Sequence, residues 1–599
     1  MKYRICTLIV LAASWLPARA IDNLTTLLPE DVTIFSSSTD SNLFDRLEDH
    51  PIRKAIAASE LKKVFAPLMA KHAENKEKTE KILKDETGKS LEEIQNMFSG
   101  PSALGVNIDV AKIFMQGMAG APGAEPETAL KGILDATMVM TFSGDEAMAD
   151  KIARSYGRIF KEMIPNTATA ARPFKLATFP DEYDATSDDY AGVKLHTWKL
   201  KKGAKSFIET PSYALIDGTI VLCLSEAGIR AVVDRVKKGG KSLADSPRFT
   251  ALAKSSKDSD MVSFFDLGSV VKSAMNIAAK QGGAAAGQGL SVVRALGLEK
   301  MDFIYMTLDL TKNRSDLEFG MTYHGEPGLM KLMTAFSAGT VPTFIPPDAE
   351  SASYGAIDFG KLLAVIEGIV KEAVPAMGDI IGAQLDELKK QLGVDIRKDI
   401  LGNLAPDVVS ATETPPEAAS KGDEEVDIEP TILGLKLKNR KALELAVNTI
   451  INKTAPDGAM FDKREYKGLT IYNMKDAPMG YVFTDDWFFL SMGPQTLLEK
   501  TLTRLAKGGD DHLFSLPVVK SALEGLAGGD MSTGYFDLES TLDSLLGMAA
   551  GFGEMPGISD MVNLKDLPKK LNLPLVLGTR QYADAGSVRV RFHIAEKKK

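Results

Sequence analysis

The chain carries the same succession of landmarks twice, and this duplication constrains its fold more than any other feature. The matched pairs are Pro29 with Pro347, Asp40 with Asp358, Gly88 with Gly393, Pro101 with Pro406, Ala147 with Ala442, Tyr213 with Tyr481, Asp266 with Asp537, and Phe319 with Val590. The offset between partners shrinks along the chain, and it is larger for the first pair than for the last. Chance matches would scatter, whereas a second copy shortened by a few deletions drifts in this way. We therefore predict two tandem halves, residues 24–326 and 344–596, joined by a connector at 327–343.

The first twenty residues have the pattern of a secretion signal. Lys2 and Arg4 precede an apolar run from Ile5 to Leu16, and Ala18-Arg19-Ala20 supplies the small residues of a cleavage site. The run is shorter than the roughly 20 residues that a membrane-spanning helix needs. We expect cleavage after Ala20, a periplasmic or secreted mature protein, and no membrane span in it. An uncleaved N-terminal anchor is the alternative.

Composition argues against several classes of protein. Of the two cysteines, Cys6 belongs to the signal, so Cys223 has no disulfide partner in the mature monomer. The formal net charge is −9, and no basic stripe interleaved with aromatic residues is present, which argues against nucleic-acid binding. With 44% hydrophobic and 25% charged residues, the chain has an ordinary globular composition and length for a large core.

Strand and helix patterns recur at corresponding places in both halves. A strand that ends in a helix-capping Asp is expected four times, at Asp40, Asp266, Asp358 and Asp537. The Asp217-Gly218 pair between two apolar runs predicts a tight hairpin. We predict an α+β fold built of two pseudo-repeats, each with a largely antiparallel sheet and helices packed on one face.

The strand that closes each half alternates strictly between apolar and polar residues. In the first half the apolar set is Leu317, Phe319, Met321 and Tyr323, and in the second it is Val588, Val590, Phe592 and Ile594. Alternation of period two is typical of a strand with one buried and one wet face. We therefore expect the apolar sides to be buried, with Asp316 and Glu318, or Arg589 and Arg591, exposed.

Three segments lack periodicity and are predicted to be loops: 119–126, 282–289 and 412–427. The Gly-rich segment 282–289 lacks the Gly-Lys-Ser/Thr ending of a phosphate-binding loop, so no nucleotide site is expected there.

The search for chemistry leaves no candidate site. The junction Asp residues are explained by helix capping, and the six histidines occur singly rather than in a metal-binding pair. Ser-x-x-Lys occurs at 59–62 and 269–272, but the chain has no Lys-Thr-Gly, and the second half has Ser540 and Asp543 in place of Ser269 and Lys272. We predict no catalytic residue, no metal ligand and no cofactor.

Two stretches resemble a family of exported bacterial proteins. Leu27 to Asp31 matches its Leu-Pro-x-Asp start, which is followed by strand, Asp and helix, and Leu392 to Pro406 matches its Leu-Gly-x-Asp-Leu-type segment. The first half departs from the pattern with Thr87-Gly-Lys-Ser-Leu91. The resemblance implies no activity and brings no catalytic residues.

Together these features predict an exported, soluble, non-enzymatic envelope protein with a binding or structural role. A carrier or chaperone for a hydrophobic ligand, lipid or peptide, held between the halves is the alternative, and the 25 methionines suit a variable apolar surface. An enzyme with a composite site comes third. Function is expected in what the halves do not share, or in the cleft between them.

Overall fold

The computed structural model describes residues 24–39, 50–64, 66–113, 132–163, 182–204, 206, 208–311, 314–414, 428–454, 460–524, 526, 531–539, 542, 572–584 and 586–597. The predicted signal, Asp40, the 119–126 segment and most of the 412–427 segment lie outside these residues.

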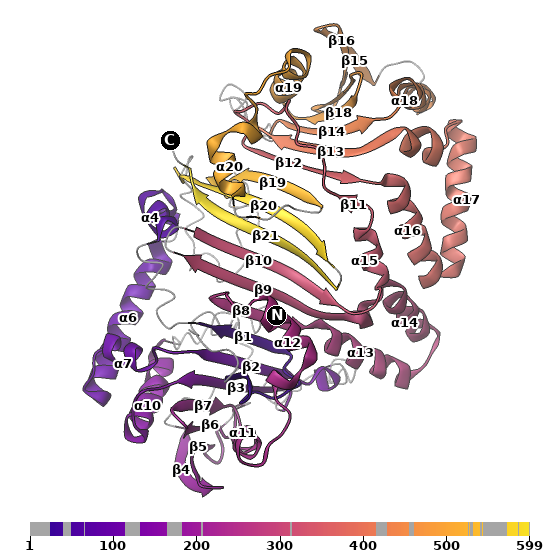
Figure 1. Ribbon diagram of the computed structural model, residues 1–599. Helices are drawn as coiled ribbons and strands as arrows, with labels where there is room; N and C mark the ends of the chain where they lie inside the picture. The colour runs from indigo at the N-terminus through magenta and orange to yellow at the C-terminus, as the bar shows by residue number, and fades with distance from the viewer. Residues whose placement is uncertain are drawn as a thin grey trace.

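The described strands form one continuous sheet in which every pairing is antiparallel (Figure 1). Those of the first half are β1 (Ile34–Ser38), β2 (Ser102–Ile108), β3 (Leu134–Thr141), β4 (Tyr183–Tyr190), β5 (Val193–Leu200), β6 (Ser212–Ile216), β7 (Thr219–Cys223), β8 (Met261–Asp266), β9 (Met301–Thr311) and β10 (Arg314–Tyr323). After the short β11 (Phe336–Ser337), the second half has β12 (Ser351–Ile357), β13 (Leu404–Thr412), β14 (Thr431–Leu437), β15 (Phe461–Tyr466), β16 (Leu469–Met474), β17 (Met479–Phe483), β18 (Trp487–Met492), β19 (Ser532–Asp537), β20 (Leu575–Asp584) and β21 (Ser587–Glu596). The predicted α+β class with an antiparallel sheet is confirmed.

The order of the strands reads the same from both ends. Their pairings give β4-β5-β6-β7-β3-β2-β1-β8-β9-β10 followed by β21-β20-β19-β12-β13-β14-β18-β17-β16-β15, with β11 alongside one end of β12. The halves join where β10 pairs with β21, and Phe319 lies opposite Val590. These two residues are also the last matched pair in the sequence. The arrangement is what a twofold relation between the halves requires, although the duplication itself stays a prediction from the sequence.

Helices lie on both faces of the sheet, not only on one as expected. The face that bears Phe35, Phe264 and Phe303 is called here the covered face, because α11 (Glu226–Lys238) and α12 (Pro247–Ser255) pack on it in the first half, and α19 (Thr496–Lys507) and α20 (Pro517–Leu523) in the second. The other face is called the open face. Described helices that pack on its outer parts are α7 (Leu91–Met97) and α10 (Glu146–Met163) at one end and α18 (Arg440–Thr454) at the other.

The remaining helices lie along the ends of the strands (Figure 1). At one side these are α4 (Pro51–Ala58), α5 (Leu61–Val64) and α6 (Ala66–Thr87), and at the other α13 (Leu267–Gln281), α14 (Ala284–Leu296), α15 (Gly328–Met333), α16 (Phe359–Ala373) and α17 (Pro375–Leu392). Because α14 of the first half packs against α16 of the second, the halves meet through helices as well as strands.

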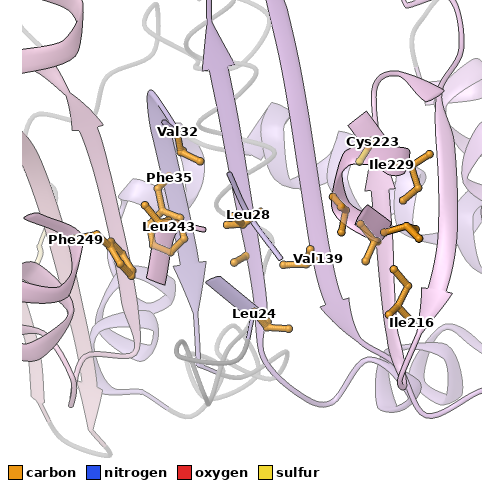
Figure 2. Close-up of a cluster of buried hydrophobic side chains, with 14 of the residues drawn as sticks. Leu24, Leu28, Val32, Phe35, Val139, Ile216, Cys223, Ile229, Leu243 and Phe249 are labelled. Carbon is orange, nitrogen blue, oxygen red and sulfur yellow. The ribbon is translucent and has the colours of Figure 1, made fainter. Parts of the chain in front are cut away.

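Each half has its own hydrophobic core on the covered face. In the first half, Phe35 stacks on Phe264 with ring centroids 5.1 Å apart, and Phe249 of α12 meets Phe35 edge-on at 5.2 Å. Leu24 and Leu28, at the N-terminal end of the described chain, are buried members of this core (Figure 2). The peptide N–H of Leu243 donates to the carbonyl of Leu28, as that of Leu513 donates to Ile345 in the second half. The two cores are separated on this face by β10 and β21.

Several local predictions are confirmed. Asp266 accepts a hydrogen bond from the N–H of Ser269 at 2.8 Å, and Asp358 from Lys361 at 2.9 Å, so both cap the helices that follow them. Asp537 accepts from the N–H of Glu539 and forms an ion pair with Lys597. Asp217 and Gly218 have φ of 46° and 74°, as a tight hairpin turn requires.

The prediction of a loop at 282–289 is wrong for most of its length, because α14 begins at Ala284. Only Gly282 and Gly283, with φ of 67° and 101°, break the chain between α13 and α14. Alanines at 284–286 favour a helix, and packing against α16 stabilises it despite Gly287 and Gly289.

Candidate functional site

The seam between the halves has two chemically opposite sides. It consists of β10 and β21, flanked by β9 and β20 (Figure 1). Because side chains alternate along a strand, Glu318 and Arg591 project from the covered face and Phe319 and Val590 from the open face. Each side is a candidate for function, since the closing strands carry acids in one half and bases in the other.

On the covered face, acids of the first half pair with bases of the second. Arg591 donates from Nε to Glu318, which also accepts the hydroxyl of Tyr305 at 2.8 Å. Two residues along the strands, Nδ1 of His593 lies 2.6 Å from a carboxylate oxygen of Asp316. Glu318 and Arg591, which distinguish the two closing strands in the sequence, are thus direct partners across the seam, whereas Arg589 pairs with Asp584 of β20.

The protein environment keeps these groups in the states that the pairing needs. Burial opposes the charge of Arg591, but the hydrogen bond and the charge of Glu318 outweigh it and raise the pKa of the guanidinium. Burial, with the charge of Glu318, raises the pKa of Tyr305, so its hydroxyl remains a donor at neutral pH. The Tyr305 ring lies directly on Gly320, where an added Cβ would be 2.3 Å from the ring.

On the open face, nine apolar side chains from three adjacent strands form what we call the apolar seam patch. Its members are Ile304, Met306 and Leu308 on β9, Leu317, Phe319 and Met321 on β10, and Val588, Val590 and Phe592 on β21. None of the nine is buried, and Ile304 and Phe319 are 41% and 43% exposed. Phe319 and Phe592 meet edge-on with ring centroids 5.9 Å apart.

The expected orientation of the closing strands is therefore wrong. Glu318 has only 13% of its side chain exposed, whereas Phe319 beside it is among the most exposed aromatic residues described. The reason is tertiary: α11, α12, α19 and α20 form both cores on the covered face, whereas on the open face the described helices cover the outer parts of the sheet and, through α4 and α5, only the end of the seam at Ile594. Alternation predicted the strands but could not say which side the helices would occupy.

A second cluster of ionisable groups lies between α10 and the sheet. Nε2 of His196 is 2.9 Å from Glu146, the Tyr213 hydroxyl donates to Asp150 at 2.9 Å, and the His196 and Tyr213 rings stack 4.5 Å apart. Among the described residues, no serine, threonine or cysteine bonds to His196, so the cluster lacks the nucleophile of a hydrolytic triad. In the second half, stacked Tyr472 and Tyr481 occupy the corresponding strand positions.

The other residues that the sequence raised have structural surroundings. Cys223 is buried beside Thr137, and burial raises the pKa of its thiol to about 12. The hydroxyl of Ser269 donates to Asp266 at 2.7 Å. Within the described ranges, no group of three or more His, Cys, Asp or Glu residues is arranged to hold a metal ion. A shallow cavity of about 230 Å³ between α17 and the turn at Ile396–Ile400 is lined by both acids and bases.

Comparison with known proteins identifies no relative by sequence. No protein-family model matches the chain, and no curated protein matches it. Three crystal forms of a protein named TP0453 show a distant structural similarity, with TM-scores of 0.22, 0.22 and 0.21 and sequence identities of 12%, 12% and 6%. The alignments cover 43%, 43% and 50% of this chain and 78%, 93% and 79% of TP0453. In the part of the chain that the structure describes, no helix is both long and apolar enough to cross a membrane.

Proposed function

We propose that this chain is an exported, non-enzymatic binding protein of a bacterial envelope, and that it holds a hydrophobic ligand on the apolar seam patch between its halves. The exposure of that patch carries the proposal. Nine neighbouring apolar side chains share one face, and none of them is buried. Apolar surface left in water costs roughly 25 cal/mol per Å², and contiguous patches of this kind generally mark binding surfaces.

The chemistry of the patch favours a hydrocarbon chain over a peptide. The peptide groups of β9, β10, β20 and β21 already pair with one another along the sheet. A peptide lying on the patch would therefore bury amides without partners, which costs about 1–3 kcal/mol for each group. An acyl chain carries no such groups and needs only the apolar contact that the nine side chains offer.

Two methionines distinguish the patch from a rigid aliphatic surface. Met306 and Met321 have flexible, unbranched side chains. Flexible, polarisable side chains adapt to ligands of variable shape. This supports a carrier for a class of apolar molecules rather than for one compound. The enzyme interpretation stays third, because the His196 cluster has no nucleophile among the described residues.

The proposal is tested with a neutral apolar dye, N-phenyl-1-naphthylamine, whose fluorescence rises in apolar surroundings. We expect saturable binding by the purified mature chain, and at least about tenfold weaker binding by Phe319→Asp, which puts a charge at the centre of the patch. Leu445→Asp is the matched control, since Leu445 is 69% exposed on α18, away from the seam. Equal binding by both variants, or no saturable binding by the parent chain, contradicts the proposal.

A further inference from the structure

Three arginines converge on the covered face of the seam, all from the second half. Arg589 and Arg591 lie two residues apart on β21, and Arg580 of β20 is directly opposite Arg591. Tyr582 lies opposite Arg589, and its ring centroid is 5.3 Å from the guanidinium carbon of Arg589 and 5.6 Å from that of Arg591. Like charges directly opposite each other on neighbouring strands destabilise a sheet. This arrangement therefore needs negative charge to offset it.

The described residues supply only part of that charge. Arg591 pairs with Glu318, and Arg589 donates from Nη2 to Asp584 at 2.6 Å. No ion pair of Arg580 is found within the described ranges. The Nε atoms of Arg580 and Arg589 are shielded from solvent and have no hydrogen-bond partner in the part of the chain that the structure describes. Buried donors of this kind are costly unless something accepts from them.

The corresponding positions of the first half exclude a merely architectural need for arginine. Gly320 lies opposite Tyr305 as Arg591 lies opposite Arg580, so Arg580, Arg589 and Arg591 correspond to Tyr305, Glu318 and Gly320 of the first half. The same sheet positions are thus compatible with a tyrosine, an acid or no side chain. The cluster belongs to one half only, which is where a function specific to that half would lie.

We propose that Arg580, Arg589 and Arg591 form a binding site for an oxyanion, a phosphate or carboxylate group, on the covered face of the seam. The planar guanidinium group presents paired donors that match such oxyanions. Glu318 and Asp584 hold two of the three arginines in place, and Arg580 provides the uncompensated charge. The site is on the opposite face of the sheet from the apolar seam patch, so it does not depend on the ligand proposed for that patch.

The experiment measures pyrophosphate binding by isothermal titration calorimetry on the full mature chain. We expect Arg580→Gln to weaken binding about tenfold or more, and Arg580→Lys, which keeps the charge but loses the fork, to have an intermediate effect. The matched control is Arg440→Gln on α18, an arginine that is paired with Glu444 and Asp485; it should bind as the parent does. Without anion, Arg580→Gln should melt at the same temperature as the parent or higher, because it relieves the repulsion with Arg591.

A second arm distinguishes a soluble oxyanion from a lipid headgroup. The parent and Arg580→Gln chains are floated with vesicles of phosphatidylglycerol or of phosphatidylcholine. Loss of either pyrophosphate binding or phosphatidylglycerol binding in Arg580→Gln supports the site and identifies the source of the anion. Equal binding by the parent and Arg580→Gln in both arms, or the absence of binding in both, overturns the proposal.

Discussion

The two sides of the seam reverse the usual relation between polarity and burial. On the covered face, Glu318 and His593 are charged or polar and largely shielded, whereas on the open face Phe319 and Ile304 are apolar and exposed. Folding does not require an apolar patch to stay exposed, and such patches generally mark sites that contact other molecules. The covered side thus pairs charges of the two halves, whereas the open side leaves apolar side chains accessible.

The largest expected difference between the two faces is tested by replacing one phenylalanine with alanine on each face and comparing the loss of stability. Phe303→Ala on β9 removes a ring that is 2% exposed and packs on Phe264 at 4.3 Å, so it should lower the free energy of unfolding by about 3–5 kcal/mol. Phe319→Ala on the adjacent strand should cost less than about 1 kcal/mol. Urea unfolding of both variants provides the measurement. Similar losses would mean that the two sides are equally important for stability.

The next largest effect concerns the pairing across the seam. Glu318→Ala leaves Arg591 and the Tyr305 hydroxyl without their acceptor and should cost about 2 kcal/mol, less than a fully buried pair because Arg591 is partly exposed. The double variant Glu318→Ala/Arg591→Ala should lose less than the sum of the single variants. Glu465→Ala on the edge strand β15 is the control, with a change within about 0.5 kcal/mol. Strict additivity in the double variant would show that the pair contributes nothing.

Two glycine-to-alanine substitutions are expected to change the stability by smaller amounts and in opposite directions. Gly320→Ala would place a Cβ against the buried Tyr305 ring and should destabilise the chain by about 1–3 kcal/mol. Gly287→Ala, in the interior of α14 with nothing within 4 Å of the new Cβ, should stabilise it by about 0.5–1 kcal/mol. Thermal melting of the two variants should shift in opposite directions. A rise in melting temperature for Gly320→Ala would show that the ring does not rest on this glycine.

The smallest expected effect depends on pH. Burial, with the charges of Asp260 and Asp316, raises the pKa of Asp309, which lies opposite Asp316 on the covered face. A carboxyl whose folded pKa is raised stabilises the fold as pH falls through that value and opposes it once ionised. Asp309→Asn should therefore be more stable than the parent at pH 7.5, and the difference should shrink toward roughly pH 4. A constant difference across this range would assign the effect to packing instead.

Features that depend on neighbouring residues could be predicted from the sequence, whereas features that depend on distant contacts could not. Caps at Asp266 and Asp358 and the turn at Asp217-Gly218 follow from neighbouring residues, and the structure has them as predicted. The continuity of the sheet across the halves depends on contacts between residues far apart in the chain, such as Phe319 with Val590. No local pattern encodes which face the helices cover, so the exposed side of Phe319 could not be inferred.

The candidate sites show the same limit. Alternation places Arg589 and Arg591 on one side of β21, but it does not bring Arg580 opposite Arg591, since that depends on the register of β20. One signal in the sequence was informative: the closing strands carry acids in one half and bases in the other. Read as complementary rather than as two exposed faces, that difference would have predicted the ionic pairing of Glu318 with Arg591 across the seam.

The long separation of β10 from β21 in the sequence has a consequence for folding during synthesis. β10 ends at Tyr323 and its partner begins at Ser587, so nearly the whole second half is synthesised between them. At a synthesis rate of about 5–20 residues per second, a nascent first half waits roughly 10–50 s with the hydrogen-bonding edge of β10 unoccupied. An uncovered strand edge is a template for wrong pairing. The free edge of β10 is therefore available for pairing with another chain until β21 has been synthesised.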